Sequence, residues 1–224
     1  MAKTTLLTEE RAVRVDSGRV PLEGDLNVPA HPRAVVLFAH GSGSSRFSSR
    51  NKRVATLFNE TGFATLLIDL LTPGEDEIDA FTREYRFDIG RLAERLVGAV
   101  DWLARDPVTA KLPVALFGAS TGGGAALVAA AEIPDRVAAV VSRGGRPDLA
   151  GAALTRVRAP TLLIVGGNDE PVIELNREAL ARLTAPARLE LIQGATHLFE
   201  EPGALEEVAR LATAWIETYA AVAS

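Results

Sequence analysis

The sequence of 224 residues contains no cysteine, so disulfide bonds, thiolate metal sites and a cysteine nucleophile are all excluded. Histidine is scarce, and the chain offers three candidates for a histidine general base, namely His31, His40 and His197. Lysine is scarce too, because arginine supplies most of the 24 basic residues. The arginines are scattered and the net charge is −5, which together argue against a nucleic-acid partner.

Long apolar runs are missing as well. No stretch approaches the length of a membrane span, and the first twenty residues have no apolar core of the signal-peptide type. No Pro/Gly/Ser-rich linker or change of composition divides the chain. We therefore expect a cytoplasmic protein with no membrane partner, folded as a single domain over residues 1–224.

The sequence does contain short apolar runs that predict strands. Residues 11–16 and 19–27 predict a hairpin around Asp16-Ser17-Gly18. Six short, mainly apolar runs predict strands that are buried on both faces. They span residues 34–39, 64–69, 113–117, 137–141, 161–165 and 189–192.

Helical patterns separate these runs. Apolar residues spaced by three and four predict a helix over 89–103 with Asp88 as its N-cap, and further helices are predicted over 171–183 and 202–219. The acidic run from Glu75 to Asp79 is interpreted as a solvated loop, with a lid as the alternative. The alternation predicts an α/β fold, in which a mostly parallel open sheet starts with an antiparallel hairpin and has helices on both faces.

The stretch Gly118-Ala119-Ser120-Thr121-Gly122 has the pattern G-x-S-x-G, between a predicted strand and a small-residue helix. In this context the pattern predicts a nucleophile elbow with Ser120 at its tip. The alternative is a helix N-cap on a phosphate-binding loop. However, the turn lacks the Lys-Ser/Thr of a P-loop, and Leu127 stands where a dinucleotide fingerprint needs its third glycine.

A nucleophilic serine needs a histidine base and an orienting carboxylate, and in elbow hydrolases they follow in the order Ser, acid, His. His197 is the only histidine after Ser120, and Asp169 follows a predicted strand between them. Glu170 is the competing acid because it is adjacent. Since ligands of open α/β sheets bind beyond the carboxyl ends of the strands, Ser120, Asp169 and His197 are expected to converge there.

Three further positions are candidates for the same edge. The backbone N–H groups of Thr121 and Ser42 are expected to form an oxyanion hole, and His40 is expected to support the loop from beneath. Arg143 follows the sixth strand, and it is interpreted either as a salt-bridge residue or as a fork that holds a substrate carboxylate.

These motifs resemble those of the α/β-hydrolases, and more closely those of the dienelactone-hydrolase-like family. The resemblance covers nearly the whole chain and implies an α/β-hydrolase fold, ester hydrolysis and a triad of Ser120, Asp169 and His197. Dienelactone hydrolases proper use a cysteine nucleophile, and this chain has Ser120 in its place. The motifs are His40-Gly41, Gly118–Gly123, Gly166–Asp169, His197–Phe199 with Pro202-Gly203, Arg86–Ile89 and Ser142–Pro147.

The sequence thus predicts a serine hydrolase that cleaves small carboxylic esters or lactones through an acyl-enzyme, with water as the second substrate and no cofactor or metal. Residues 142–160 leave little room for a cap, so a minimal cap and an open pocket for small acyl groups are expected. Two alternatives stay open: a ligand-binding or regulatory protein on a hydrolase scaffold, and a hydrolase of thioesters or amides.

Overall fold

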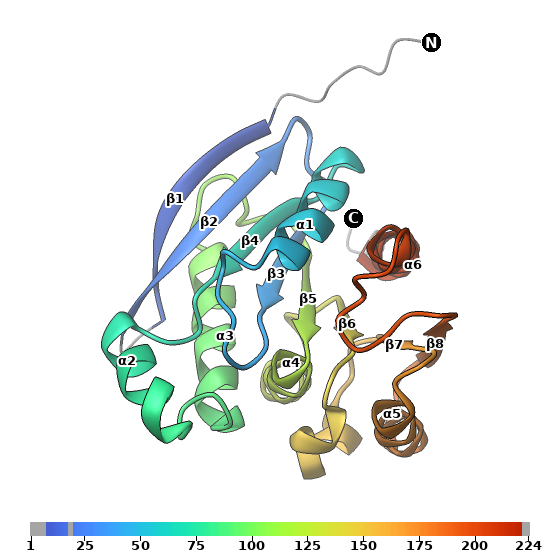
Figure 1. The fold of residues 1–224 in the computed structure, drawn as a ribbon. Helices are drawn as coiled ribbons and strands as arrows, with labels where there is room; N and C mark the ends of the chain where they lie inside the picture. Colours follow the sequence, from blue (N-terminus) through green and yellow to red (C-terminus); the bar gives the residue numbers. More distant parts are fainter. Residues whose placement is uncertain (1–7, 18–19, 221–224) are drawn as a thin grey trace, which may run out of the picture.

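The computed structural model describes residues 8–17 and 20–220, and an eight-stranded sheet forms its centre (Figure 1). The strands are β1 (Thr8–Asp16), β2 (Pro21–Pro29), β3 (Val35–Ala39), β4 (Ala64–Ile68), β5 (Val114–Ala119), β6 (Ala139–Arg143), β7 (Thr161–Gly166) and β8 (Ala187–Ile192). Their order across the sheet is β1-β2-β4-β3-β5-β6-β7-β8. β2 is antiparallel to both of its neighbours, whereas every other pair is parallel.

The predicted open sheet with an antiparallel start is therefore confirmed. The strands from β3 to β7 are buried along their whole length, as their mainly apolar sequences predict. The prediction that residues 189–192 are buried on both faces is wrong, because they belong to β8, which is only partly buried at the edge of the sheet. The predicted turn at Asp16-Ser17-Gly18 lies partly outside the described residues.

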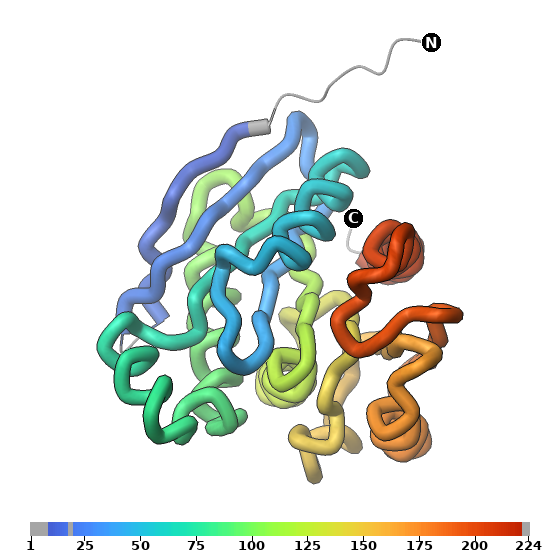
Figure 2. Tube along the Cα trace, in the orientation of Figure 1, coloured from blue at the N-terminus to red at the C-terminus, as the bar shows by residue number. Residues whose placement is uncertain are grey.

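Helices cover both faces of the sheet (Figures 1 and 2). They are α1 (Ser49–Glu60), α2 (Pro73–Thr82), α3 (Ile89–Leu103), α4 (Thr121–Glu132), α5 (Glu170–Arg182), α6 (Ala204–Ala220) and the 3₁₀ segment η1 (Pro147–Arg156). α1 and α6 pack together on one face, and α3, α4, α5 and η1 lie on the other. Successive residues of β3 alternate between the two cores, with Val36 and Phe38 facing α1 and α6.

The predicted helices over 89–103, 171–183 and 202–219 correspond to α3, α5 and α6. The side chain of Asp88 caps α3 as expected, since its carboxylate accepts the N–H of Arg91 at 3.1 Å. The predicted start of the last helix at residue 202 is wrong, because α6 begins at Ala204 and Pro202 precedes it. The helix α1 has no counterpart among the predicted elements.

The interpretation of the acidic run as a solvated loop is wrong, because these residues form α2. Thr72 and Glu75 make a capping box, in which the Thr72 hydroxyl accepts the N–H of Glu75 and the Glu75 carboxylate accepts the N–H of Thr72. Asp79 is buried and accepts the backbone N–H groups of Tyr85 and Arg86 at 2.8 and 3.0 Å. The signature Thr-Pro-Gly-Glu at 72–75 is the signal that could have predicted this helix start.

No helix of the described ranges, 8–17 and 20–220, is both long and apolar enough to cross a bilayer. The organisation of residues 1–224 as a single domain stays a prediction.

Candidate active site

The predicted site residues follow strands whose carboxyl ends meet at one edge of the sheet. β5 lies beside β3 and β6, so that Gly118 pairs with Ala39 and Ala119 pairs with Arg143. Arg143 therefore lies on the strand beside β5, level with the residue that precedes Ser120. The amide of Ser120 continues the ladder by donating to the carbonyl oxygen of Arg143 at 3.3 Å.

The elbow has the sharp geometry that the G-x-S-x-G pattern predicts. Ser120 has φ 50° and ψ −122°, a conformation that L-residues rarely adopt and that stores strain. A Cβ at Gly118 would lie 2.5 Å from the carbonyl oxygen of Gly122, and a Cβ at Gly122 would overlap the carbonyl oxygen of Ala39. Only glycine fits at both positions, because the strand and helix approach so closely.

Asp169 and His197 are directly hydrogen-bonded. The distance from Nδ1 of His197 to Oδ2 of Asp169 is 2.6 Å. Asn168 connects the loop after β7 to the loop after β8. Its side-chain amide donates to the carbonyl oxygen of Gly194 at 3.0 Å, and its backbone N–H donates to that of Ala195 at 2.9 Å. A proton on Nδ1 shared with the carboxylate leaves Nε2 of His197 as the basic nitrogen.

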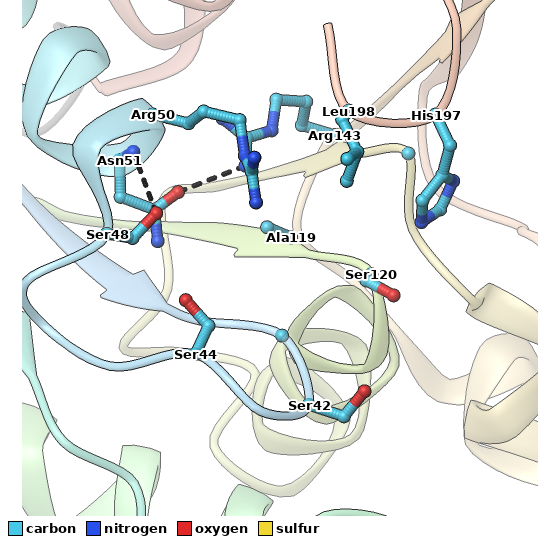
Figure 3. Close-up of a pocket in the computed structure, with 12 residues that line it drawn as sticks. Ser42, Ser44, Ser48, Arg50, Asn51, Ala119, Ser120, Arg143, His197 and Leu198 are labelled. Carbon is cyan, nitrogen blue, oxygen red and sulfur yellow. Dashed lines mark hydrogen bonds between the residues drawn. The ribbon is translucent and has the colours of Figure 1, made fainter. Parts of the chain in front are cut away.

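Four of the predicted residues line a single cavity of about 260 Å³, namely Ser42, Ser120, Arg143 and His197 (Figure 3). Asp169 is not part of the cavity lining and lies behind His197, to which it is bonded. Among the described residues of the lining, the apolar side chains are those of Leu198 and Ala119, so the cavity wall is mostly polar.

Thr121 also lies outside this cavity lining, and its side chain is buried. Its backbone N–H is the first of α4, where N–H groups have no partner within the helix and point toward the helix start. The two oxyanion-hole candidates, Thr121 and Ser42, therefore come from the start of α4 and from the loop after β3.

His40 holds the loop after β3, as the sequence predicts. Its Nδ1–H donates to the carbonyl oxygen of Gly41 at 2.9 Å, and its Nε2 accepts the N–H of Leu70 at 2.9 Å. Burial lowers the pKa of His40, and the Gly41 hydrogen bond and the nearby carboxylate of Asp69 oppose this only in part. The ring is therefore held neutral, in the tautomer that both hydrogen bonds require.

Arg143 does not form the predicted salt bridge. Its Nη2 donates to Oδ1 of Asn51 at 3.1 Å, whereas Arg146 forms the ion pair with Asp148, at 2.7 Å. Burial, and secondarily the charge of Arg50, lowers the pKa of Arg143 to about 10. The α1 residues Arg50 and Asn51, and Ser48 that caps this helix, also line the cavity and were missed at the sequence level, because no helix was predicted there.

Within the described ranges, no group of three His, Asp or Glu side chains is placed to hold a metal ion. Two ionisable pairs include a residue of the cavity lining, His197 with Asp169 and Arg50 with Glu200.

Comparison with known proteins decides the family. The sequence pattern of the Dienelactone hydrolase family matches residues 22–222. The chain belongs to this family. It is similar to a solved dienelactone hydrolase from Anabaena variabilis at 61% identity, over 95% of this chain and 99% of that one, with a TM-score of 0.93. The predicted resemblance to dienelactone hydrolases is confirmed, and with it the coarse prediction of a hydrolase.

Two further comparisons extend this result. An α/β serine hydrolase without lid from Xanthomonas campestris superposes with a TM-score of 0.74 over 94% of each chain, and at 19% identity it shows the fold alone. The predicted α/β-hydrolase fold with a minimal cap is confirmed. Two curated Mycobacterium tuberculosis proteins, provisionally named phosphoribosyl transferases, are 58% identical over 92% of this chain and 46% of their own. The chain thus spans about half the length of these curated relatives.

Proposed function

We propose that the protein is a serine hydrolase of small carboxylic esters or lactones, in which Ser120 is the nucleophile. The observation that carries this proposal is the hydrogen bond between His197 and Asp169 beside a cavity that Ser120 and His197 both line. Membership of the dienelactone hydrolase family supports the same reaction class.

The proposed reaction has two halves. Ser120 Oγ attacks the ester carbonyl carbon while Nε2 of His197 takes the hydroxyl proton, and the C–O bond to the alcohol then breaks as His197 returns that proton to the leaving oxygen. A water molecule repeats the sequence on the acyl-enzyme and releases the acid and free Ser120. Asp169 keeps the proton on Nδ1 and stabilises the imidazolium that forms in each half.

The N–H groups of Thr121 and Ser42 would stabilise the oxyanion. Gly41 supports this role for Ser42, because its carbonyl oxygen is held by both Nδ1 of His40 and the N–H of Ser44. In a trans peptide the C=O of Gly41 and the N–H of Ser42 point in opposite directions, so fixing one also fixes the other. Donors that are fixed before charge develops need no reorganisation during the reaction.

Labelling with a fluorophosphonate tests the proposal against a non-catalytic scaffold. We expect one covalent adduct per chain, located on Ser120, because only a serine activated by a base attacks the phosphorus. The Ser120→Ala variant should remain unlabelled, while the exposed Ser49→Ala variant serves as a matched control and should label fully. Mass spectrometry of the intact protein gives the result, and an unlabelled wild-type protein would support the ligand-binding alternative.

We also propose a preference for short acyl chains. The cavity of about 260 Å³ has few apolar side chains in its wall, and a methylene contributes about 0.8 kcal/mol only where apolar surface covers it. In a series of 4-nitrophenyl esters, kcat/KM should be highest for acetate to butyrate and decline beyond them. A steady increase out to ten carbons would contradict this prediction. Thioesters and amides of the same acyl groups test the alternative that another bond is cleaved.

The transferase name of the mycobacterial relatives suggests a second activity, but it belongs to chains about twice as long. Because the hydrolase family pattern covers residues 22–222 of this chain, we propose that this part contributes hydrolysis in such proteins.

A further inference from the structure

One end of the active-site cavity is built from donors that the proposed reaction does not use. Figure 3 shows Arg50, Asn51, Ser44 and Ser48 gathered at the end of the cavity away from Ser120 and His197, with the side chain of Arg143 reaching toward them. This donor cluster combines two guanidinium groups, a carboxamide and two hydroxyls. It lies at the start of α1, a helix of 12 residues.

Arg143 is the buried member of this cluster and has unused hydrogen-bonding capacity. The residue is 7% exposed, and among the described residues its Nη1 atom has no hydrogen-bond partner. The guanidinium carbon lies 5.8 Å from the ring centroid of Phe117 and 5.9 Å from that of Phe199, so two aromatic rings fix its position. A buried donor without a partner costs free energy, which a ligand that accepts from it would recover.

The charge of the cluster also lacks compensation. Arg50 is paired with Glu200 at 3.0 Å, but that carboxylate is largely exposed, and no acidic residue of the described chain forms an ion pair with Arg143. The two guanidinium groups and the one carboxylate leave a formal charge of +1. The positive end of the α1 dipole adds to this charge, as at other helix starts that bind anions.

We propose that this cluster is a phosphate subsite, and that the ester or lactone cleaved at Ser120 carries a phosphate group. This inference rests on the proposed hydrolase function and names the substrate class. A carboxylate fits the cluster less well, because its two oxygens lie in one plane and pair best with a single guanidinium, whereas the donors here come from β6, α1 and the loop after β3. A tetrahedral phosphate offers three oxygens to donors from different directions, here the guanidinium of Arg143, the N–H groups of Arg50 that do not bond to Glu200, and a serine hydroxyl.

Binding of inorganic phosphate tests the subsite without any turnover. Isothermal titration calorimetry at pH 8 and constant ionic strength should show phosphate binding at least tenfold more tightly than acetate. The Arg143→Met variant should weaken phosphate binding at least about tenfold, and Arg50→Gln several-fold, because each removes charge-assisted hydrogen bonds. Arg53→Gln is the matched control and should bind like wild type, since Arg53 lies on the same helix, pairs with Glu206 and does not line the cavity.

Circular dichroism would check that each variant folds. If the Arg143→Met variant does not fold, the Arg50→Gln variant still tests the subsite, because Arg50 is partly exposed. Equal binding of phosphate and acetate would overturn the proposal, as would phosphate binding that both arginine substitutions leave unchanged.

The second arm uses 4-nitrophenyl esters whose acyl chains end in phosphate, carboxylate or hydroxyl. We expect kcat/KM to be highest for the phosphate ester and the three values to converge in Arg143→Met. Hydrolysis of all three esters at equal rates by wild type would overturn the phosphate subsite while leaving the hydrolase standing. Phosphate binding that depends on Arg143, without hydrolysis of any ester, would overturn the hydrolase and leave the anion subsite standing.

Discussion

Replacement of Ser120 by alanine is expected to reduce ester hydrolysis by at least ~10³-fold while leaving the protein folded. Alanine removes the attacking oxygen, and it keeps the Cβ that the backbone at this position already accommodates. Steady-state kinetics on 4-nitrophenyl acetate, with a thermal melt of the same sample, measures both parts of the prediction.

The His197→Ala variant provides the companion measurement. Because the two residues act in one step, the double variant should lose little more activity than either single variant. Additive losses, or more than a tenth of the activity retained in Ser120→Ala, would show that the nucleophile lies elsewhere.

The second large effect is expected at Asp169, where Asn substitution should lower kcat by roughly 10⁴-fold. The carboxamide has nearly the shape of the carboxylate, but its N–H₂ group can face Nδ1 and favour the tautomer with the proton on Nε2. That tautomer cannot take a proton from Ser120. The expected signature is a lower kcat with little change of KM for a short ester.

Glu170→Gln is the control for this substitution. Glu170 is adjacent in sequence but exposed at the start of α5, whereas Asp169 Oδ2 contacts the imidazole at 2.6 Å. The Glu170→Gln variant should therefore retain most of the wild-type kcat. A larger loss in Glu170→Gln than in Asp169→Asn would transfer the orienting role to Glu170.

Those parts of the fold that depend on local pattern could be predicted from the sequence. The mainly apolar runs predicted the buried strands, and Gly118 to Gly122 predicted a sharp turn that the φ of Ser120 reproduces. The chain order of Asp169 and His197, combined with the rule that strand ends carry the ligands, predicted two residues that the fold brings into contact.

The parts that were missed depend on local capping or on contacts distant in sequence. α2 was missed because its acidic residues looked solvated, although the side chains of Thr72 and Glu75 cap it. The polar sequence of α1 gave no clear apolar stripe, so Arg50 and Asn51 were not considered for the site. Their contact with Arg143 spans about ninety residues of chain and arises only from the order of β3, β5 and β6 in the sheet.

The backbone of Ser120 finally has a consequence for laboratory evolution. Glycine at this position would adopt φ 50° freely and relieve strain of about 1–3 kcal/mol. A library screened only for survival on heating would therefore enrich glycine at position 120 and discard the nucleophile. Directed evolution of a more thermostable variant must therefore include selection for turnover in every round, because the residue that favours stability at this position removes the activity.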